Sequence, residues 1–109
     1  SLRKAEFLVL TGEEANEKAS EYIRASLFSF RTEFIAAHTK NGLSEAAIEA
    51  LNEVQINYGE DANPLIEALI EDLDHFVKDA IMCDGVAHFL ASYDHKENTK
   101  DGFLIFRTN

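Results

Sequence analysis

The stretch NPLIEALIEDLDHFVKDAIMCDG, residues 63–85, carries the clearest helical pattern in the chain and decides the fold class. Asn63-Pro64 combines a capping side chain with a proline whose missing N–H costs nothing at the first helical position. Apolar residues then recur every three or four positions, which is the spacing of one helix face; they are Leu65, Ile66, Leu69, Ile70, Leu73, Phe76, Val77, Ala80 and Ile81. Asp84-Gly85 supplies a stop signal. The stretch predicts a helix over about 64–83.

A longer helical pattern precedes this stretch, over about 12–39. Thr11 and Glu14 have the spacing of a capping box, in which each side chain bonds the backbone N–H of the other residue. The apolar residues behind them follow one helix face, namely Ala15, Ala19, Tyr22, Ile23, Leu27, Phe30, Phe34 and Ala37. Asn41-Gly42 ends the pattern, because both residues tolerate the left-handed backbone conformation.

Between these two patterns lies a third one, over about 45–58. Ser44 is a helix-capping residue, and Leu43 and Ile48 stand at the two positions of a hydrophobic staple. One face carries apolar residues and a single amide, namely Ala47, Ile48, Leu51, Val54, Gln55 and Tyr58. Gly59 closes this predicted helix.

After Gly85 the apolar pattern changes from helical to alternating. Residues 87–93 and 103–108 are two β-rich runs separated by a polar stretch, and they predict a hairpin. A lone hairpin is not stable in water, so we expect it to pack on the helices. Residues 5–10 fit either a third strand or a short helix, and the pattern slightly favours the helix. The predicted fold is α+β and mostly α, with residues 1–109 forming a single domain.

The charge of the chain is strongly asymmetric. The net charge is −10, and residues 41–95 contain twelve carboxylates and one cation, Lys78. Such a region repels nucleic acid and anionic membranes, and it attracts basic proteins or cations. The five glycines are scattered singly, so the sequence shows no Gly-rich loop that could cradle phosphate. We therefore expect no direct contact with nucleic acid or membrane.

Cysteine content and hydropathy indicate the compartment. The chain has one Cys, which cannot form an internal disulfide, as is usual in reducing compartments. No apolar run approaches the roughly 18 residues of a membrane span, and Leu8-Val9-Leu10 is too short for the apolar region of a signal peptide. We therefore expect a cytoplasmic protein.

One group of residues has the composition of a metal site. Asp72, His75 and Asp79 are three and four residues apart, so a helix places them on one face. Carboxylates and imidazole suit zinc or another divalent transition ion. The sequence offers no second paired element of the His-x-x-x-His kind, and three ligands on one exposed helix face do not make a closed site. We therefore expect no metal and no other cofactor.

The sequence does not point to a catalytic residue. Cys83 falls at a predicted helix end beside Asp84, where the helix dipole and the carboxylate both oppose thiolate formation. We expect Cys83 to be a small buried apolar residue. The Gly-x-Ser-x-Gly motif of many hydrolases does not occur in the chain. The sequence therefore favours a protein that is not an enzyme.

The C-terminal quarter carries a resemblance to known sequences. Its elements are Asp84-Gly85, His88-Phe89-Leu90, Tyr93-Asp94 and the final Phe106-Arg107-Thr108-Asn109. This ending resembles that of small uncharacterised proteins encoded by bacteriophages and prophages, which also combine an acidic helical body with a short C-terminal hairpin. The present chain differs in the loop, where His95-Lys96 stands in place of a commoner Gly. The resemblance implies an accessory role in a phage or prophage.

These observations predict a non-enzymatic protein whose acidic helical face engages a basic surface, such as that of a nucleic-acid-binding host protein. The residues expected in this face are Glu45, Glu49, Glu53, Glu67, Glu71 and Asp74. Two other functions stay open. One is a small metal-dependent enzyme that uses Asp72, His75 and Asp79, and the other is a homo-oligomeric structural protein, such as a homodimer, that buries surplus phenylalanine surface. The acidity is also compatible with a role in solubility alone.

Overall fold

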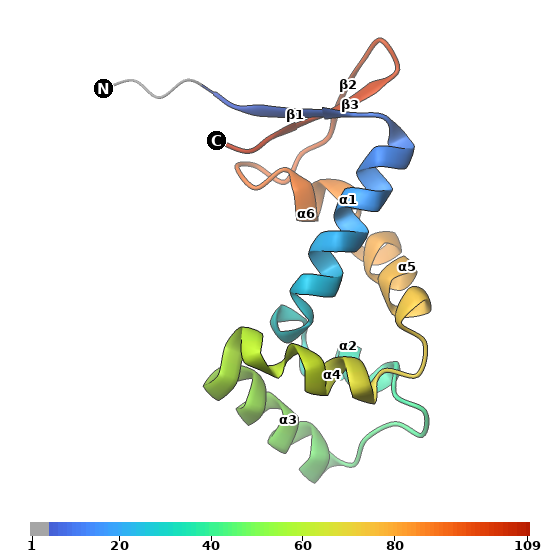
Figure 1. The fold of residues 1–109 in the computed structure, drawn as a ribbon, viewed down its shortest axis with the longest axis vertical. Helices are drawn as coiled ribbons and strands as arrows, with labels where there is room; N and C mark the ends of the chain where they lie inside the picture. The colour runs from blue at the N-terminus through green and yellow to red at the C-terminus, as the bar shows by residue number, and fades with distance from the viewer. Residues whose placement is uncertain (1–4) are drawn as a thin grey trace, which may run out of the picture. The chain divides into compact units, whose positions relative to one another are not determined.

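A computed structural model describes residues 5–109, which form two compact units (Figure 1). The terminal unit combines residues 5–23 with residues 78–109, and the central unit is Arg24–Val77. The predicted class, α+β and mostly α, is confirmed, because helices dominate and the strands form one small sheet. That the whole chain folds as one domain stays a prediction.

The terminal unit contains a three-stranded antiparallel sheet in the order β1–β3–β2 (Figure 1). Its strands are β1 (Phe7–Leu10), β2 (Asn98–Lys100) and β3 (Phe103–Arg107). β3 is the central strand, because β1 pairs with one of its edges and β2 with the other. The favoured helix over residues 5–10 is wrong, since this segment supplies the strand that covers an otherwise unpaired edge of β3.

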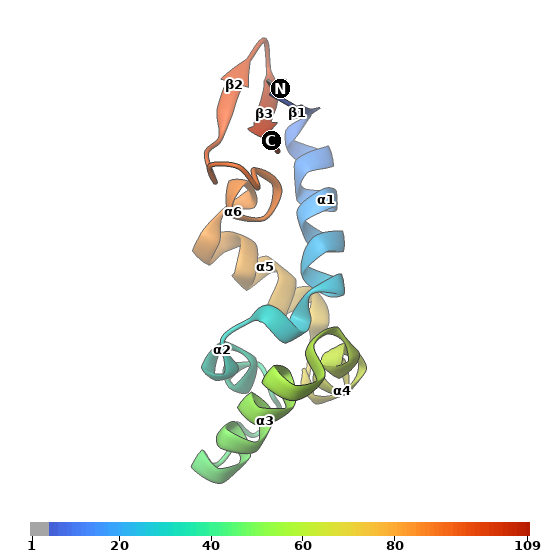
Figure 2. The same cartoon turned by 90° about the vertical axis from the view of Figure 1, so that its left-hand side faces the viewer.

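β2 and β3 form a hairpin with a two-residue turn at Asp101-Gly102 (Figure 2). Lys100 and Phe103 are paired directly on either side of this turn. Both turn residues have positive φ angles, 54° for Asp101 and 83° for Gly102. A two-residue type I′ turn requires positive φ at both positions, and Asp-Gly is one of its preferred sequences. The turn therefore has a local cause in the sequence, although the whole polar stretch over residues 94–102 was expected to form one long hairpin loop.

The predicted first strand of the hairpin, residues 87–93, is wrong. Gly85, with a φ of 79°, ends the preceding helix, and the chain then forms the short helix α6 (Val86–Leu90). Phe89 and Leu90 are both buried. Adjacent strand residues point to opposite faces of a sheet, whereas adjacent helical residues can share one buried side. The apolar run therefore belongs to a short buried helix.

Helix α1 (Gly12–Ala25) begins at the predicted capping box. The Thr11 N–H donates to Glu14 Oε1 at 2.9 Å, and the Glu14 N–H donates to Thr11 Oγ1 at 3.1 Å. Hydrogen bonding to Thr11, first to its backbone N–H and then to its side chain, lowers the pKa of Glu14. A lowered carboxyl pKa means that the box stabilises the fold above the usual pKa and loses this effect as the pH falls through the lowered value.

The predicted helix over 12–39 is divided in the structure. α1 ends at Ala25, a 3-10 turn covers Leu27–Ser29, and α2 spans Thr32–Ala37. Arg31 has an extended backbone with a ψ of 138°, so the helical hydrogen-bond ladder cannot continue through it. A break of this kind leaves backbone groups without helical partners.

Two amide side chains bind the backbone of this break. Asn63 Nδ2 donates to the Ala25 carbonyl at 2.7 Å, and Asn63 Oδ1 accepts the Phe28 N–H at 2.8 Å. Gln55 Nε2 donates to the carbonyls of Phe28 and Phe30 at 2.9 and 2.6 Å. The expectation that Asn63 caps its own helix is therefore wrong, because its side chain serves a segment far away in the sequence.

The predicted helix over 45–58 is confirmed to the residue. α3 spans Glu45–Tyr58, and the Ser44 hydroxyl accepts the Ala47 N–H at 3.2 Å as the predicted cap. Gly59 ends the helix with a φ of 53°. A further 3-10 turn, Gly59–Ala62, leads into the next helix.

The predicted helix over 64–83 is also divided, into α4 (Asn63–Leu69) and α5 (Leu73–Asp84). Ile70 is extended, with a ψ of 127°, and it forms an isolated antiparallel bridge with Thr39. The helical hydrogen bonds are therefore interrupted at Ile70, and the backbone there pairs instead with the segment that follows α2.

Of the 23 residues expected on the apolar helix faces, eleven are buried and eight are half-buried, whereas Tyr22, Ala37, Tyr58 and Leu65 are exposed. The larger buried apolar residues of the two units are Leu10, Ile23, Leu27, Ile35, Leu51, Ile66, Ile70, Phe76, Val77, Phe89, Leu90 and Phe106. None of the helices within residues 5–109 combines the length and the apolar character needed to cross a membrane.

Two phenylalanines of β3 give a matched test of the sheet as part of the core. Phe106 is fully buried, whereas Phe103 is 44% exposed. We expect Phe106→Ala to lower the free energy of unfolding by about 3–5 kcal/mol, because it removes a large buried side chain and leaves a cavity. Phe103→Ala, in the same strand, should cost less than about 1 kcal/mol. Urea denaturation of both variants measures the difference, and equal losses would contradict the assignment.

The role of Gln55 can be tested by an isosteric change. Gln55→Met keeps the length of the side chain but removes the two N–H groups that donate to the carbonyls of Phe28 and Phe30. We expect this change to lower the free energy of unfolding by about 1–3 kcal/mol, because the two carbonyls lose their partners. Asn57→Ala, at an exposed position of the same helix, should change stability by under about 0.5 kcal/mol. Urea denaturation would refute this role if both variants unfolded at the same midpoint.

Candidate functional site

Helix α3 presents three of the predicted partner-binding carboxylates in one row. Glu45, Glu49 and Glu53 are all exposed, and their spacing of four residues places them about 6 Å apart along one side of the helix. Another side of α3 carries the buried residues Leu51 and Gln55. The helix is therefore anchored by one side and holds the three carboxylates in solvent on another.

Glu49 also lines an open pocket to which α2 and α3 contribute. Arg31, Thr32 and Glu33 line the pocket from the start of α2, and Glu49 and Asn52 line it from α3. Its charged members are therefore two carboxylates and one guanidinium. The pocket therefore lies beside Glu49, the middle carboxylate of the row.

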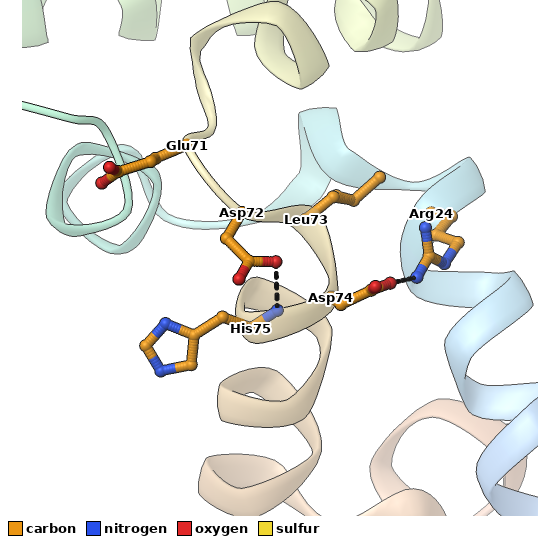
Figure 3. A pocket seen from close by; sticks show the side chains of 6 residues that line it. All are labelled: Arg24, Glu71, Asp72, Leu73, Asp74 and His75. Carbon is orange, nitrogen blue, oxygen red and sulfur yellow. Dashed lines mark hydrogen bonds and ion pairs between the residues drawn. The ribbon is translucent and has the colours of Figure 1, made fainter.

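The other three predicted partner residues do not share a helix. Glu67 lies on α4, Glu71 follows Ile70 in the segment before α5, and Asp74 lies in the first turn of α5. The expectation that one helix carries them is wrong, because the predicted helix is divided. Asp74 is also engaged in an ion pair with Arg24 (Figure 3). The structure therefore brings together the three carboxylates of α3 but does not extend that row over a second helix.

The central unit carries most of the negative charge. Residues 24–77 contain ten carboxylates and three cations, which gives −7 of the net charge of −10. All ten acidic residues are exposed. Among the residues that the structure describes, Asp74 is the one member of the ten with an ion-pair partner. The negative field of this unit is therefore largely uncompensated within it.

Asp72, one of the three residues weighed as possible metal ligands, caps a helix. Asp72 Oδ1 accepts the His75 N–H at 3.1 Å, which is an N-capping bond at the start of α5 (Figure 3). The His75 imidazole projects to a different side of α5 from the Asp74 carboxylate (Figure 3). Asp72 therefore has a structural role that does not involve a metal.

His38, which the sequence did not single out, packs against His75 within the central unit. The rings of His38 and His75 lie 5.2 Å apart, measured between centroids, and cross at 72°. His75 thus packs against His38, while Asp72 caps the first turn of α5.

Aromatic side chains and backbone bonds fix the place of His38. Its ring contacts those of Phe34 and Phe76, each at a centroid distance of 5.1 Å. Its carbonyl accepts the Glu71 N–H at 2.9 Å. The segments that carry the two histidines are therefore joined by backbone contacts as well as by packing. A signal for His38 did exist, since it follows Phe34 by four residues and continues that helix face, but the sequence could not show which residue it would meet.

The second pair of histidines, in the terminal unit, differs from the first. The rings of His88 and His95 also lie 5.2 Å apart, but His95 Nδ1 lies 2.9 Å from the His88 carbonyl. Cys83 is exposed near the end of α5, so the expectation that it is buried is wrong.

Comparison of the chain with protein-family models, with curated proteins and with solved structures yields no match.

The capping role of Asp72 makes a prediction that separates it from a ligand role. We expect Asp72→Ala to destabilise the protein by about 1 kcal/mol, because the first turn of α5 loses its cap, whereas Asp72→Asn should be nearly neutral, since Asn caps as well as Asp. Thermal and urea denaturation of the two variants provide the measurement. If Asp72→Asn lowered the free energy of unfolding as much as Asp72→Ala does, the charge of Asp72 and not its capping bond would be what stabilises α5.

Proposed function

We propose that this chain is a non-enzymatic, cytoplasmic interaction protein of the phage or prophage type, whose α3 face engages a basic surface on another protein. The observation that carries the proposal is the row of Glu45, Glu49 and Glu53, exposed at regular spacing on one anchored helix. A nucleic-acid-binding protein of the host is the kind of partner that offers such a surface, because its basic groove is built for regularly spaced phosphates.

Electrostatics supports a protein partner over nucleic acid or membrane. With a net charge of −7 in the central unit, the protein repels phosphates and anionic lipids and attracts Lys and Arg side chains. Complementary charge of this kind accelerates association and selects partners more than it adds affinity. We therefore expect binding that is fast and sensitive to salt.

Two further features of α3 suit an interface. The pocket beside Glu49 offers a recess with two carboxylates for one basic side chain of the partner, and a guanidinium can bind a carboxylate with two parallel hydrogen bonds. Ile56 and Tyr58, near the end of the helix, are 73% and 64% exposed. Apolar and aromatic side chains that become buried near the centre of an interface often contribute much of its binding energy. Ile56 lies on the same side of α3 as the acidic row and would give the complex an apolar contact there.

The proposal can be tested with two triple variants that remove equal charge. In the first, Glu45, Glu49 and Glu53 are replaced by Gln; in the second, the exposed Glu13, Glu17 and Glu21 of α1 are replaced by Gln. Both rows have the same spacing, but that of α1 is accompanied by Lys18 and Arg24. Each variant should keep the stability of the wild type within roughly 0.5 kcal/mol per substitution.

The measurement is capture of proteins from a nuclease-treated bacterial lysate on immobilised wild type and on both variants, at low and high salt. We expect wild type and the α1 variant to capture the same basic protein, and double-stranded DNA to release it. The α3 variant should lose it, mainly through slower association. Capture that is the same on all three proteins would refute the proposal and leave the acidity as a determinant of solubility.

A further inference from the structure

We propose that β1 is the docking edge for a second copy of this chain, whose own β1 pairs antiparallel to it and joins the two sheets into one continuous sheet. The order β1–β3–β2 places β1 at an edge, and no other strand within residues 5–109 pairs with its free side (Figure 1). This proposal is independent of the partner-binding proposal, because β1 belongs to the terminal unit and α3 to the central unit.

The register of β1 on β3 determines which backbone groups of β1 face the free edge. The Thr108 N–H donates to the Glu6 carbonyl at 2.9 Å. Hydrogen-bonded and non-bonded pairs alternate along an antiparallel ladder, so every second residue after Glu6 bonds to β3. The N–H and C=O groups of Phe7 and Val9 therefore point away from β3.

Two copies of β1 complement each other in one antiparallel register. When Phe7 of each copy stands opposite Val9 of the other, their outward N–H and C=O groups form two hydrogen-bonded pairs, with Leu8 on the two-fold axis. The outward groups of both residues are then all paired. Such a contact uses the same surface on both copies and closes at two, so it does not propagate into a filament.

The two edges of the sheet differ in how they are protected against pairing. Natural sheets guard their edges with short strands, with Pro or with charged side chains, above all Lys. β2 is three residues long, polar and ends in Lys100. β1 has the sequence FLVL, with neither a charge nor a proline. The composition of β1 is therefore that of an edge that accepts another strand.

Side chains add an apolar contact to the backbone pairing. Phe7 and Val9 are 55% and 54% exposed, whereas Leu10 on the other face of β1 is buried. In the two-fold register each Phe7 lies opposite Val9 of the other copy, and aromatic side chains paired with β-branched ones stabilise sheets. The dimer would therefore cover the two most exposed side chains of β1.

Charge permits this contact although the whole chain is acidic. The net charge of −10 opposes close approach of two copies over most surfaces. β1 and β3 contain no carboxylate, and their one charged residue is Arg107. Two copies therefore meet along strands that carry no negative charge.

The size of the contact predicts a weak dimer. Stable interfaces bury roughly 1,200–2,000 Å² in total, and two paired strands of four residues offer less than this. Interfaces below this range are typically transient. We therefore expect a monomer–dimer equilibrium with a Kd on the order of 100 µM.

A matched pair of lysine substitutions tests which edge is used. Val9 and Asn98 are both paired with Ile105 and are both exposed, so Val9→Lys and Asn98→Lys place the same charge in one row at the two opposite edges of the sheet. Sedimentation of the full chain at about 20 µM to 1 mM measures the equilibrium. We expect Val9→Lys to weaken dimerisation by about 10-fold or more, because edge lysines oppose strand pairing, and Asn98→Lys to leave it unchanged.

Amide hydrogen exchange of the wild-type protein gives a second test that needs no variant. With a Kd on the order of 100 µM, the amides of Phe7 and Val9 should exchange about fourfold more slowly at 1 mM than at 20 µM. The Thr99 amide, which faces the outer edge of β2 by the same alternation, should not respond. A chain that stays monomeric at 1 mM, equal weakening by both lysines, or slowed exchange at Thr99 in place of Phe7 and Val9 would each overturn the proposal.

Discussion

The fold depends on how backbone groups are satisfied where two long apolar patterns stop being helical. At the first break, Asn63 and Gln55 bond the backbone between Ala25 and Phe30. Gln55 is itself buried, and its Oε1 accepts the Thr32 hydroxyl at 2.7 Å. A buried amide with all its groups paired costs little, whereas the same carbonyls without partners would each be expensive. These two side chains therefore allow the chain to turn where its apolar pattern alone would continue a helix.

The second break has a different origin and a consequence for function. Ile70 is extended and not helical, and it pairs with Thr39. The Glu71 N–H donates to the His38 carbonyl. A continuous helix over this region would have carried Glu67, Glu71 and Asp74 as one row, but it would have had no backbone contact with the end of α2. The division therefore removes one predicted surface and places the two histidines side by side.

Elements with local causes could be predicted from the sequence, and those with distant causes could not. The Thr11–Glu14 box, the Ser44 cap and the full extent of α3 follow from neighbouring residues, and the structure confirms them. The two breaks follow from contacts between distant segments, which periodicity cannot show. The Asp101-Gly102 turn is an exception, because its local signal was present and a long loop was predicted instead. In the site, the α3 row could be predicted, whereas the partner of His75 could not.

The carboxylates of α3 and the Asp72 cap of α5 act through different physics. The carboxylates of α3 act on a partner through solvent, and such interactions are screened beyond about 8 Å at physiological ionic strength. The Asp72 carboxylate accepts the His75 N–H directly, at 3.1 Å, and this bond stabilises the first turn of α5. Added salt should therefore weaken capture of a basic protein far more than it weakens the cap. A helix-face pattern that joined Asp72 to His75 and Asp79 thus included a residue whose role is structural.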